Sequence, residues 1–198
     1  MLKKLIPLLS SLIIAGCAVA PAAKAPLNQR LSLETRTNQA INLRSWKIDG
    51  LVSIVTSDQE LSANLRWQQH LQENYQINLF GPLNMGAVSI TGNASSVVLK
   101  ANNNVYQAKS AEGLLLQYMG WTLPIDNLYY WVRGIAAPNS FSVVQTDHFN
   151  HLVMLKQNGW EIDYLRYTSV NNIDLPSKLS LKNQYMIAKL IISRWSLE

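Results

Sequence analysis

Cysteine is almost absent from this sequence, because Cys17 is the only one among 198 residues. An intramolecular disulfide is therefore excluded. Long apolar runs are also missing: the longest, Leu5–Gly16, covers about a dozen residues, whereas a transmembrane helix needs roughly 20. The formal net charge is only +5, and the body of the chain has no run of Lys or Arg. This balance argues against a nucleic-acid partner and makes anionic lipid headgroups the better match.

Sequence signatures of catalysis are missing as well. There is no G-x-S-x-G nucleophile elbow. Gly81–Gly86 has the glycine spacing of a phosphate-binding loop, but Ala87-Val88 stands where that loop requires Lys and Ser or Thr. His148 and His151 form an H-x-x-H pair beside Asp147, which we interpret as solvated residues of a hairpin turn rather than as a metal site. The sequence thus predicts a protein that is not an enzyme and that holds neither a metal ion nor a soluble cofactor.

The start of the chain has the pattern of an export signal. Lys3 and Lys4 precede the apolar stretch Leu5–Gly16, as the charged region precedes the apolar region in a secretory signal peptide. Ile14-Ala15-Gly16-Cys17 follows the order of a lipobox, whose cysteine receives a diacylglycerol and becomes the first mature residue. We therefore predict a signal peptide over residues 1–16 and a covalent lipid on Cys17.

Residues 17–45 are predicted to join this anchor to the folded domain. Ala18–Pro26 consists mostly of Ala and Pro and is typical of a flexible tether. Leu27–Leu43 lacks Gly and Pro and places several apolar residues at helical spacing, which predicts a short helix. Residues 46–198 are enough for one domain with its own core, and we expect a monomer.

From Trp46 onward, apolar and polar residues alternate in short segments, which is typical of half-buried strands. Between them, Gly92-Asn93 and Asn102-Asn103-Asn104 have turn chemistry. The predicted strands are Trp46–Thr56, Leu61–Gln68, Asn74–Phe80, Ala87–Thr91, Ser96–Ala101, Val105–Ala108, Phe141–Thr146, Leu152–Lys156, Trp160–Tyr167, Ser177–Leu181 and Met186–Trp195.

Two short helices are predicted to interrupt this antiparallel meander. Ser110 can cap a helix that runs through Met119, and Asp126 can begin another that runs through Val132. Gly120 and Gly134 stand where these helices are expected to end.

Four motifs indicate a family: Ile77–Leu83, Gly120–Ile125, Tyr130–Gly134 and Gln157–Trp160. In these motifs and their order, the chain resembles the family of the outer-membrane lipoprotein receptor LolB from Trp46 to Trp195, which is most of the mature domain. The resemblance implies a mainly β (α+β) fold, an open, incomplete antiparallel β-barrel with short helices that cover an apolar cavity.

The same resemblance implies a function. Proteins of this family accept acylated lipoproteins from the soluble periplasmic carrier LolA and place them in the outer membrane. The expected partners are therefore LolA, lipoprotein cargo and outer-membrane lipid, and the expected location is the periplasmic face of the outer membrane. Ala18, rather than aspartate, follows Cys17, which fits this destination. Because no nucleotide-binding motif is present, we expect transfer without ATP.

Two sets of site residues follow. By motif, Leu83 corresponds to a leucine that the family needs for membrane delivery, so Gly81, Pro82 and Leu83 form the predicted membrane insertion loop. Asn84 departs from the glycine that is usual there, which puts the shape of this turn in doubt. The candidate lining of the acyl-chain cavity consists of aromatic and aliphatic residues, namely Trp67, Tyr75, Ile77, Leu79, Trp121, Trp131, Trp160, Ile162 and Tyr164.

Two alternative functions are compatible with the same residues. A lipoprotein of similar architecture could carry free lipid or glycolipid, and the molecule that copurifies would distinguish it. A structural lipoprotein could bridge envelope proteins through its sheet edges, and a cavity filled with side chains would favour that function.

Overall fold

The computed structural model describes residues 25–27, 29–81 and 86–198. Cys17, Pro82 and Leu83, which are among the predicted functional residues, lie outside these ranges. The helices are α1 (Leu33–Asn42), α2 (Ala111–Met119) and α3 (Ile125–Trp131). The strands are β1 (Ser45–Thr56), β2 (Glu60–His70), β3 (Asn74–Phe80), β4 (Val88–Gly92), β5 (Val97–Ala101), β6 (Asn104–Ala108), β7 (Ser142–Thr146), β8 (Leu152–Gln157), β9 (Trp160–Val170), β10 (Ile173–Lys182) and β11 (Met186–Leu197).

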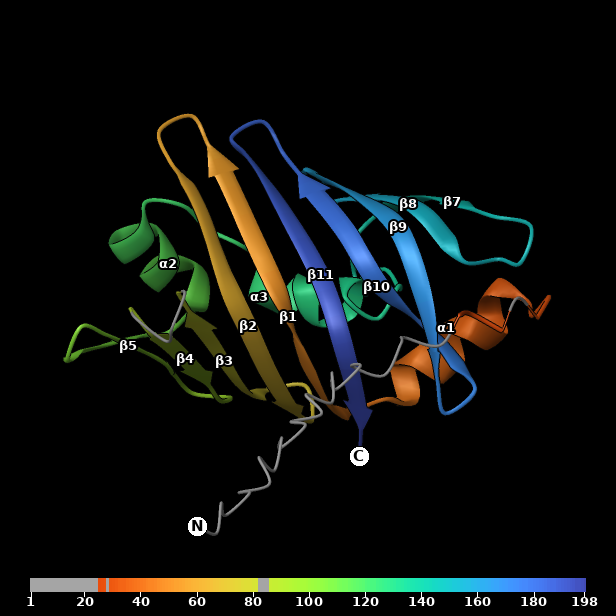
Figure 1. Cartoon of the computed structure of the whole chain (residues 1–198), viewed down its shortest axis with the longest axis horizontal. Helices are drawn as coiled ribbons and strands as arrows, with labels where there is room; N and C mark the ends of the chain where they lie inside the picture. Colours follow the sequence, from red (N-terminus) through yellow and green to blue (C-terminus); the bar gives the residue numbers. More distant parts are fainter. Residues whose placement is uncertain (1–24, 28, 82–85) are drawn as a thin grey trace, which may run out of the picture.

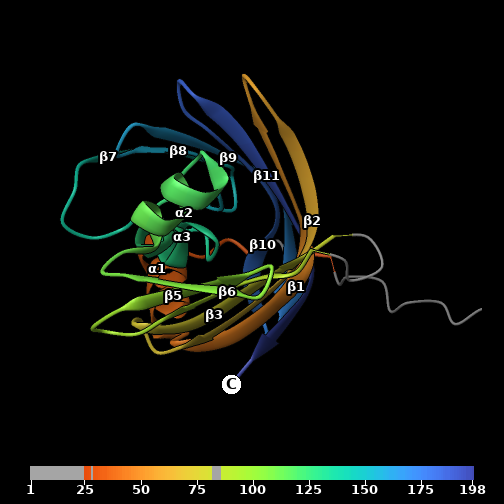
Figure 2. The ribbon, with the colours of Figure 1, turned by 90° about the vertical axis from the view of Figure 1, so that its left-hand side faces the viewer.

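All eleven strands belong to one sheet, in the order β6-β5-β4-β3-β2-β1-β11-β10-β9-β8-β7 (Figure 1). Every pairing in it is antiparallel, as in the β1–β2 and β1–β11 pairs. Figure 2 shows that the sheet curls around α2 and α3. In the part of the chain that the structure describes, β6 and β7 stay unpaired edges, so the barrel is open and incomplete. The predicted fold class is confirmed.

Asparagine forms several of the tight hairpin turns. Asn102-Asn103, Asn158-Gly159 and Asn171-Asn172 each have two consecutive residues with positive φ. Two such residues define the hairpin turn whose twist matches that of the flanking strands, and Asn and Gly tolerate this conformation best. The predicted signals of α2 are confirmed too, because the Ser110 hydroxyl accepts a hydrogen bond from the Gly113 amide and Gly120 ends α2 with a φ of 75°. Helix α3 begins at Ile125, one residue before the predicted start at Asp126.

Strand β10 begins four residues before the predicted start at Ser177, and the reason is local. The pairing of β10 with β9 shifts register between Pro176 and Lys178, and β10 pairs with β11 only from Lys178 onward. Pro176 lacks an N–H and lies where only one side of the strand is paired. The irregularity hides the alternating pattern in the sequence.

The segment that contains α1 packs against the barrel, so it is part of the folded unit and not only a linker. The Leu27 amide donates a hydrogen bond of 2.9 Å to Oδ1 of Asp174, and Nη1 of Arg36 lies 3.2 Å from Oδ2 of the same carboxylate. Asn150 donates a hydrogen bond of 2.7 Å from Nδ2 to the Leu31 carbonyl. The folded unit therefore begins before residue 46, the predicted start of the domain.

His151 corrects the prediction for the H-x-x-H pair. The β7–β8 turn does contain both histidines, and His148 is exposed, but His151 is buried. Its two ring nitrogens lie 3.0 Å from Oδ2 of Asp147 and 2.9 Å from Oδ2 of Asp174. His151 is thus a structural residue that joins the turn to β10, a role that the local sequence does not reveal.

The described ranges contain neither a membrane-spanning helix nor a cluster of metal ligands. No helix there is both long and apolar enough to cross a bilayer. No group of three or more His, Cys, Asp or Glu side chains there is arranged to hold a metal ion.

Candidate functional site: an apolar cavity beneath two helices

The concave face of the sheet forms one wall of a cavity. Side chains alternate between the two faces of a strand, so every second residue points inward. Cross-strand pairs stack these inward residues in rows: Trp67 of β2 lies opposite Ile77 of β3, and Leu65 lies opposite Leu79. The residues that the sheet contributes to the lining are Val52, Ile54, Leu65, Trp67, Ile77, Leu79, Ile90, Leu181, Ala188, Lys189 and Leu190.

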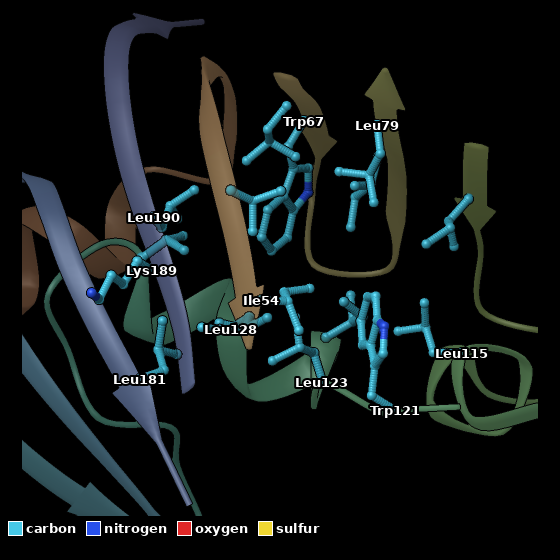
Figure 3. Close-up of a pocket in the computed structure, with 17 residues that line it drawn as sticks. Ile54, Trp67, Leu79, Leu115, Trp121, Leu123, Leu128, Leu181, Lys189 and Leu190 are labelled. Carbon is cyan, nitrogen blue, oxygen red and sulfur yellow. The ribbon is translucent and has the colours of Figure 1, made fainter. Parts of the chain in front are cut away.

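The opposite wall comes from α2, α3 and the segment between them (Figure 3). Leu115 projects from α2, Trp121 and Leu123 from the connecting segment, and Leu128 from α3. All four side chains are buried. Glu112 of α2 accepts a hydrogen bond of 3.1 Å from the Ile125 amide at the start of α3, which holds the two helices together. Burial outweighs this hydrogen bond and raises the pKa of the Glu112 carboxyl.

The cavity has a volume of about 60 Å³. An apolar cavity of about 150 Å³ holds one benzene molecule. This volume is too small for an acyl chain, so α2, α3 or the sheet would have to move outward to admit one. A lining of aliphatic and indole groups suits such a ligand, because it offers no competing polar contact.

The polar atom of Trp67 is satisfied away from the cavity. Its Nε1 donates a hydrogen bond of 2.8 Å to Oε1 of Gln69, and Nε2 of Gln69 donates to the carbonyls of Leu71 and Gln72. Gln69 is buried, so an unpaired amide there would be costly. This chain of hydrogen bonds fixes the indole ring so that its apolar surface faces the cavity.

Four of the nine predicted cavity residues line this space: Trp67, Ile77, Leu79 and Trp121. Trp131, Trp160, Ile162 and Tyr164 are buried in another part of the core. The Tyr164 hydroxyl donates a hydrogen bond of 3.0 Å to the Trp131 carbonyl, and the Trp131 and Trp160 rings lie 6.4 Å apart. Three of these residues belong to β9 and Trp131 is the last residue of α3, so they pack between that strand and that helix.

Tyr75 lies in a separate hollow that Glu112 and Asp126 also line. Burial raises the pKa of the Tyr75 phenol, and the two nearby carboxylates raise it further. The surroundings of its ring are therefore more polar than the cavity.

The predicted membrane insertion loop connects β3 to β4, and only its ends are described. Gly81 follows the last residue of β3, and Gly86 has a φ of 67°. The flanking strands β3 and β4 are adjacent and paired, with Leu79 opposite Val88.

A curled antiparallel sheet with two helices over a cavity that is lined by apolar residues and Lys189 defines a protein of the kind that encloses apolar ligands. The chain belongs to the LolB family, because the family model described as outer membrane lipoprotein LolB matches residues 44–195.

Similar proteins agree with this assignment, and a similar structure agrees with the fold. The outer-membrane lipoprotein LolB of Coxiella burnetii is 34% identical over 190 residues, which cover 94% of this chain and 90% of that protein. The outer-membrane lipoprotein LolB of Pseudomonas paraeruginosa is 39% identical over 186 residues, which cover 92% and 90%. The crystal structure of a LolA superfamily protein from Nitrosomonas europaea matches with a TM-score of 0.50 at 7% identity, over 85% of this chain and 94% of that one, and shows the likeness of fold.

Proposed function

We propose that this chain receives acylated lipoproteins from the periplasmic carrier LolA and inserts them into the outer membrane without ATP. The observation that carries the proposal is the apolar cavity beneath α2 and α3 in a member of the LolB family. Its lining offers cargo hydrophobic contact and no catalytic group, so we further propose that the protein is not an enzyme and uses no cofactor beyond the lipid on Cys17.

The energetics of acyl chains support a carrier-to-receptor transfer. Moving lipid chains into water costs about 0.8 kcal/mol per methylene, or on the order of 12 kcal/mol for one chain of roughly 15 methylenes. Cargo must therefore pass directly from one apolar site to the next. A higher affinity at this cavity than at the carrier, and a higher affinity in the bilayer, would suffice to drive both steps.

Two sequence features would complete this function. The lipid on Cys17 would hold the protein at the periplasmic face of the outer membrane. Gly81, Pro82 and Leu83 would contact the bilayer while the cargo leaves the cavity, because Leu is favourable in the membrane interior.

A two-step transfer assay tests the proposal. The mature chain without its lipidated cysteine, residues 18–198, retains every described helix and strand. It is mixed with a radiolabelled lipoprotein on LolA and then with liposomes, in the absence of nucleotide. We expect the label to move to the protein and then into the liposomes.

Other results would change the assignment. No transfer from an active carrier to folded protein would reject the receptor function. Bound lipid or glycolipid without protein would then indicate a lipid-binding lipoprotein, and the absence of any apolar ligand would indicate a structural one.

A further inference from the structure

Arg133 is a buried cation that has no carboxylate partner among the described residues. Its side chain is 2% exposed, and its hydrogen bonds go to three neutral carbonyls: Nε to Tyr129 at 2.8 Å, and Nη1 to Ala40 at 2.7 Å and Leu43 at 3.0 Å. Nη2 is buried and has no hydrogen-bond partner in the ranges that the structure describes. Burial lowers the pKa of this guanidinium. A buried charge that no opposite charge balances is costly.

Two contacts partly explain why the Arg133 charge is buried at this place. The carbonyls of Ala40 and Leu43 belong to the C-terminal end of α1, where a cation is favourable. The guanidinium carbon also lies 3.9 Å from the centroid of the Tyr129 ring, a cation–π contact. Neither contact supplies a negative charge, and neither uses Nη2.

Arg133 also lines a hollow of about 340 Å³ between α3, the end of α1 and the β2–β3 turn. Arg44 lies at the same hollow, is exposed, and has no hydrogen bond or ion pair with any described residue. Glu73 is the one carboxylate in the lining, and it is exposed on the turn. The hollow thus combines two arginines with one exposed acid.

The hollow and the apolar cavity lie on opposite sides of α3. Leu128 and the following Val132 line the cavity, whereas Tyr129, Tyr130 and Arg133 line the hollow. An apolar ligand and a polar one could therefore occupy the two sides of the same helix at the same time.

We propose that this hollow binds a phosphate-type oxyanion, with Arg133 and Arg44 as its cationic partners. The guanidinium fork matches two oxygens of a phosphate, and the negative charge offsets the cost of burying Arg133. Tyr130 is half-buried, lines the same hollow and has its ring centroid 5.3 Å from the guanidinium carbon. Because Nη2 is buried, a neighbouring side chain such as Tyr130 must shift before a phosphate can reach it. The phosphate can come from a phospholipid headgroup or from free phosphate in solution, since both present the same oxygens.

The test follows the Arg133 Nε–H signal in NMR spectra of the ¹⁵N-labelled mature chain, residues 18–198. Inorganic phosphate and monomeric dihexanoylphosphatidylglycerol are titrated separately, with sodium chloride at matched ionic strength as the reference. We expect a saturable shift of the Arg133 signal that chloride does not produce. A response to the lipid alone identifies a headgroup site, and a response to phosphate alone identifies a free-phosphate site.

Variants make the result specific. Arg44→Gln removes a charge without a structural contact and should weaken binding roughly tenfold. Lys100→Gln, an exposed change of equal charge on β5, should leave binding unchanged. Arg133→Lys identifies the Arg133 signal by its loss from the spectrum, and circular dichroism checks that this variant folds.

No saturable shift with either ligand, or equal affinity in wild type and Arg44→Gln, overturns the proposal. Neither cargo nor carrier is present, so failure here leaves the transfer function untouched.

Discussion

The side-chain amide of Gln59 donates a hydrogen bond of 2.8 Å to the backbone carbonyl of Met119. Gln59 lies in the β1–β2 turn and Met119 is the last residue of α2. One exposed hydrogen bond therefore joins the sheet to a helix that covers the cavity. The cavity is too small for an acyl chain as it stands. We therefore expect that breaking this hydrogen bond makes it easier for α2 to move away from the sheet.

Gln59→Ala should make the cavity easier to enter. An exposed hydrogen bond contributes about 1 kcal/mol, so its loss should increase binding of an apolar fluorophore such as anilinonaphthalene sulfonate up to about fivefold. Fluorescence titration measures this. Gln68→Ala, an exposed change on the neighbouring strand β2, is the control. Equal dye binding by both variants would show that the α2 end does not limit access.

Leu115 and Leu116 are adjacent on α2 and form a matched pair. Leu115 is 1% exposed and lines the cavity, whereas Leu116 is 59% exposed. Leu115→Ala should lower the free energy of unfolding by about 2–4 kcal/mol because it removes buried apolar volume. Leu116→Ala should change it by less than about 0.5 kcal/mol. Urea unfolding measures the free energy of unfolding of both variants. Similar decreases in the two variants would contradict this orientation of α2.

Leu83→Glu should separate acceptance of cargo from its delivery. Leu is favourable in the bilayer interior, and a charged side chain there costs about 3 kcal/mol. We expect the variant to accept lipoprotein from LolA as well as wild type does and to release little of it into liposomes. Val105→Glu, which changes an exposed apolar residue of β6, is the control. Normal delivery by Leu83→Glu at normal abundance would reject the role of this loop.

Acid should weaken the contact between the N-terminal segment and β10. Burial raises the pKa of Asp174, but hydrogen bonds from Leu27 and His151 and the charge of Arg36 outweigh it, so the net pKa is lowered. The stabilisation by Asp174 is therefore complete above the unfolded-state pKa of about 3.9 and is lost as the pH falls through the lower folded-state value.

Asp174→Asn provides the measurement. At pH 7 the variant should be about 2–4 kcal/mol less stable than wild type in urea unfolding, because it leaves buried partners unpaired. The difference should shrink as the pH falls below about 4. Asp58→Asn, at an exposed position of the β1–β2 turn, is the control. A difference that stays constant between pH 3 and pH 7 would rule out an ionised Asp174 as the cause.

Most elements of the fold could be predicted from the sequence because local patterns specify them. The alternating residues of Asn74–Phe80 coincide with β3, and the Ser110 cap and Gly120 delimit α2. Strand β10 was predicted too short, since its register shift at Pro176 breaks the alternation on which such predictions depend. His151 was misinterpreted because Asp174, one of its two partners, lies 23 residues away in the chain.

The cavity was harder to predict than the fold. Alternation tells which residues share a face, and Ile162 does lie opposite the cavity residue Leu181 in the β9–β10 pair. The alternation of residues along a strand does not predict which part of a curled sheet α2 and α3 will cover. Ile162 and Tyr164 are therefore packed in the core, whereas Ile90 and Leu115, which no motif singles out, line the cavity.

The hydrogen bond between Leu27 and Asp174 fixes the point at which the N-terminal tether joins the folded domain. Asp174 lies at the start of β10, the end of the sheet opposite the β1–β2 turn. The ten residues from Cys17 to Pro26 can span at most about 36 Å, and the twelve residues of β1 extend about 40 Å. The proposed lipid on Cys17 would therefore be joined to the domain at the end opposite the β1–β2 turn. Tether and strand together would allow that turn to lie at most roughly twice the tether length from the membrane surface.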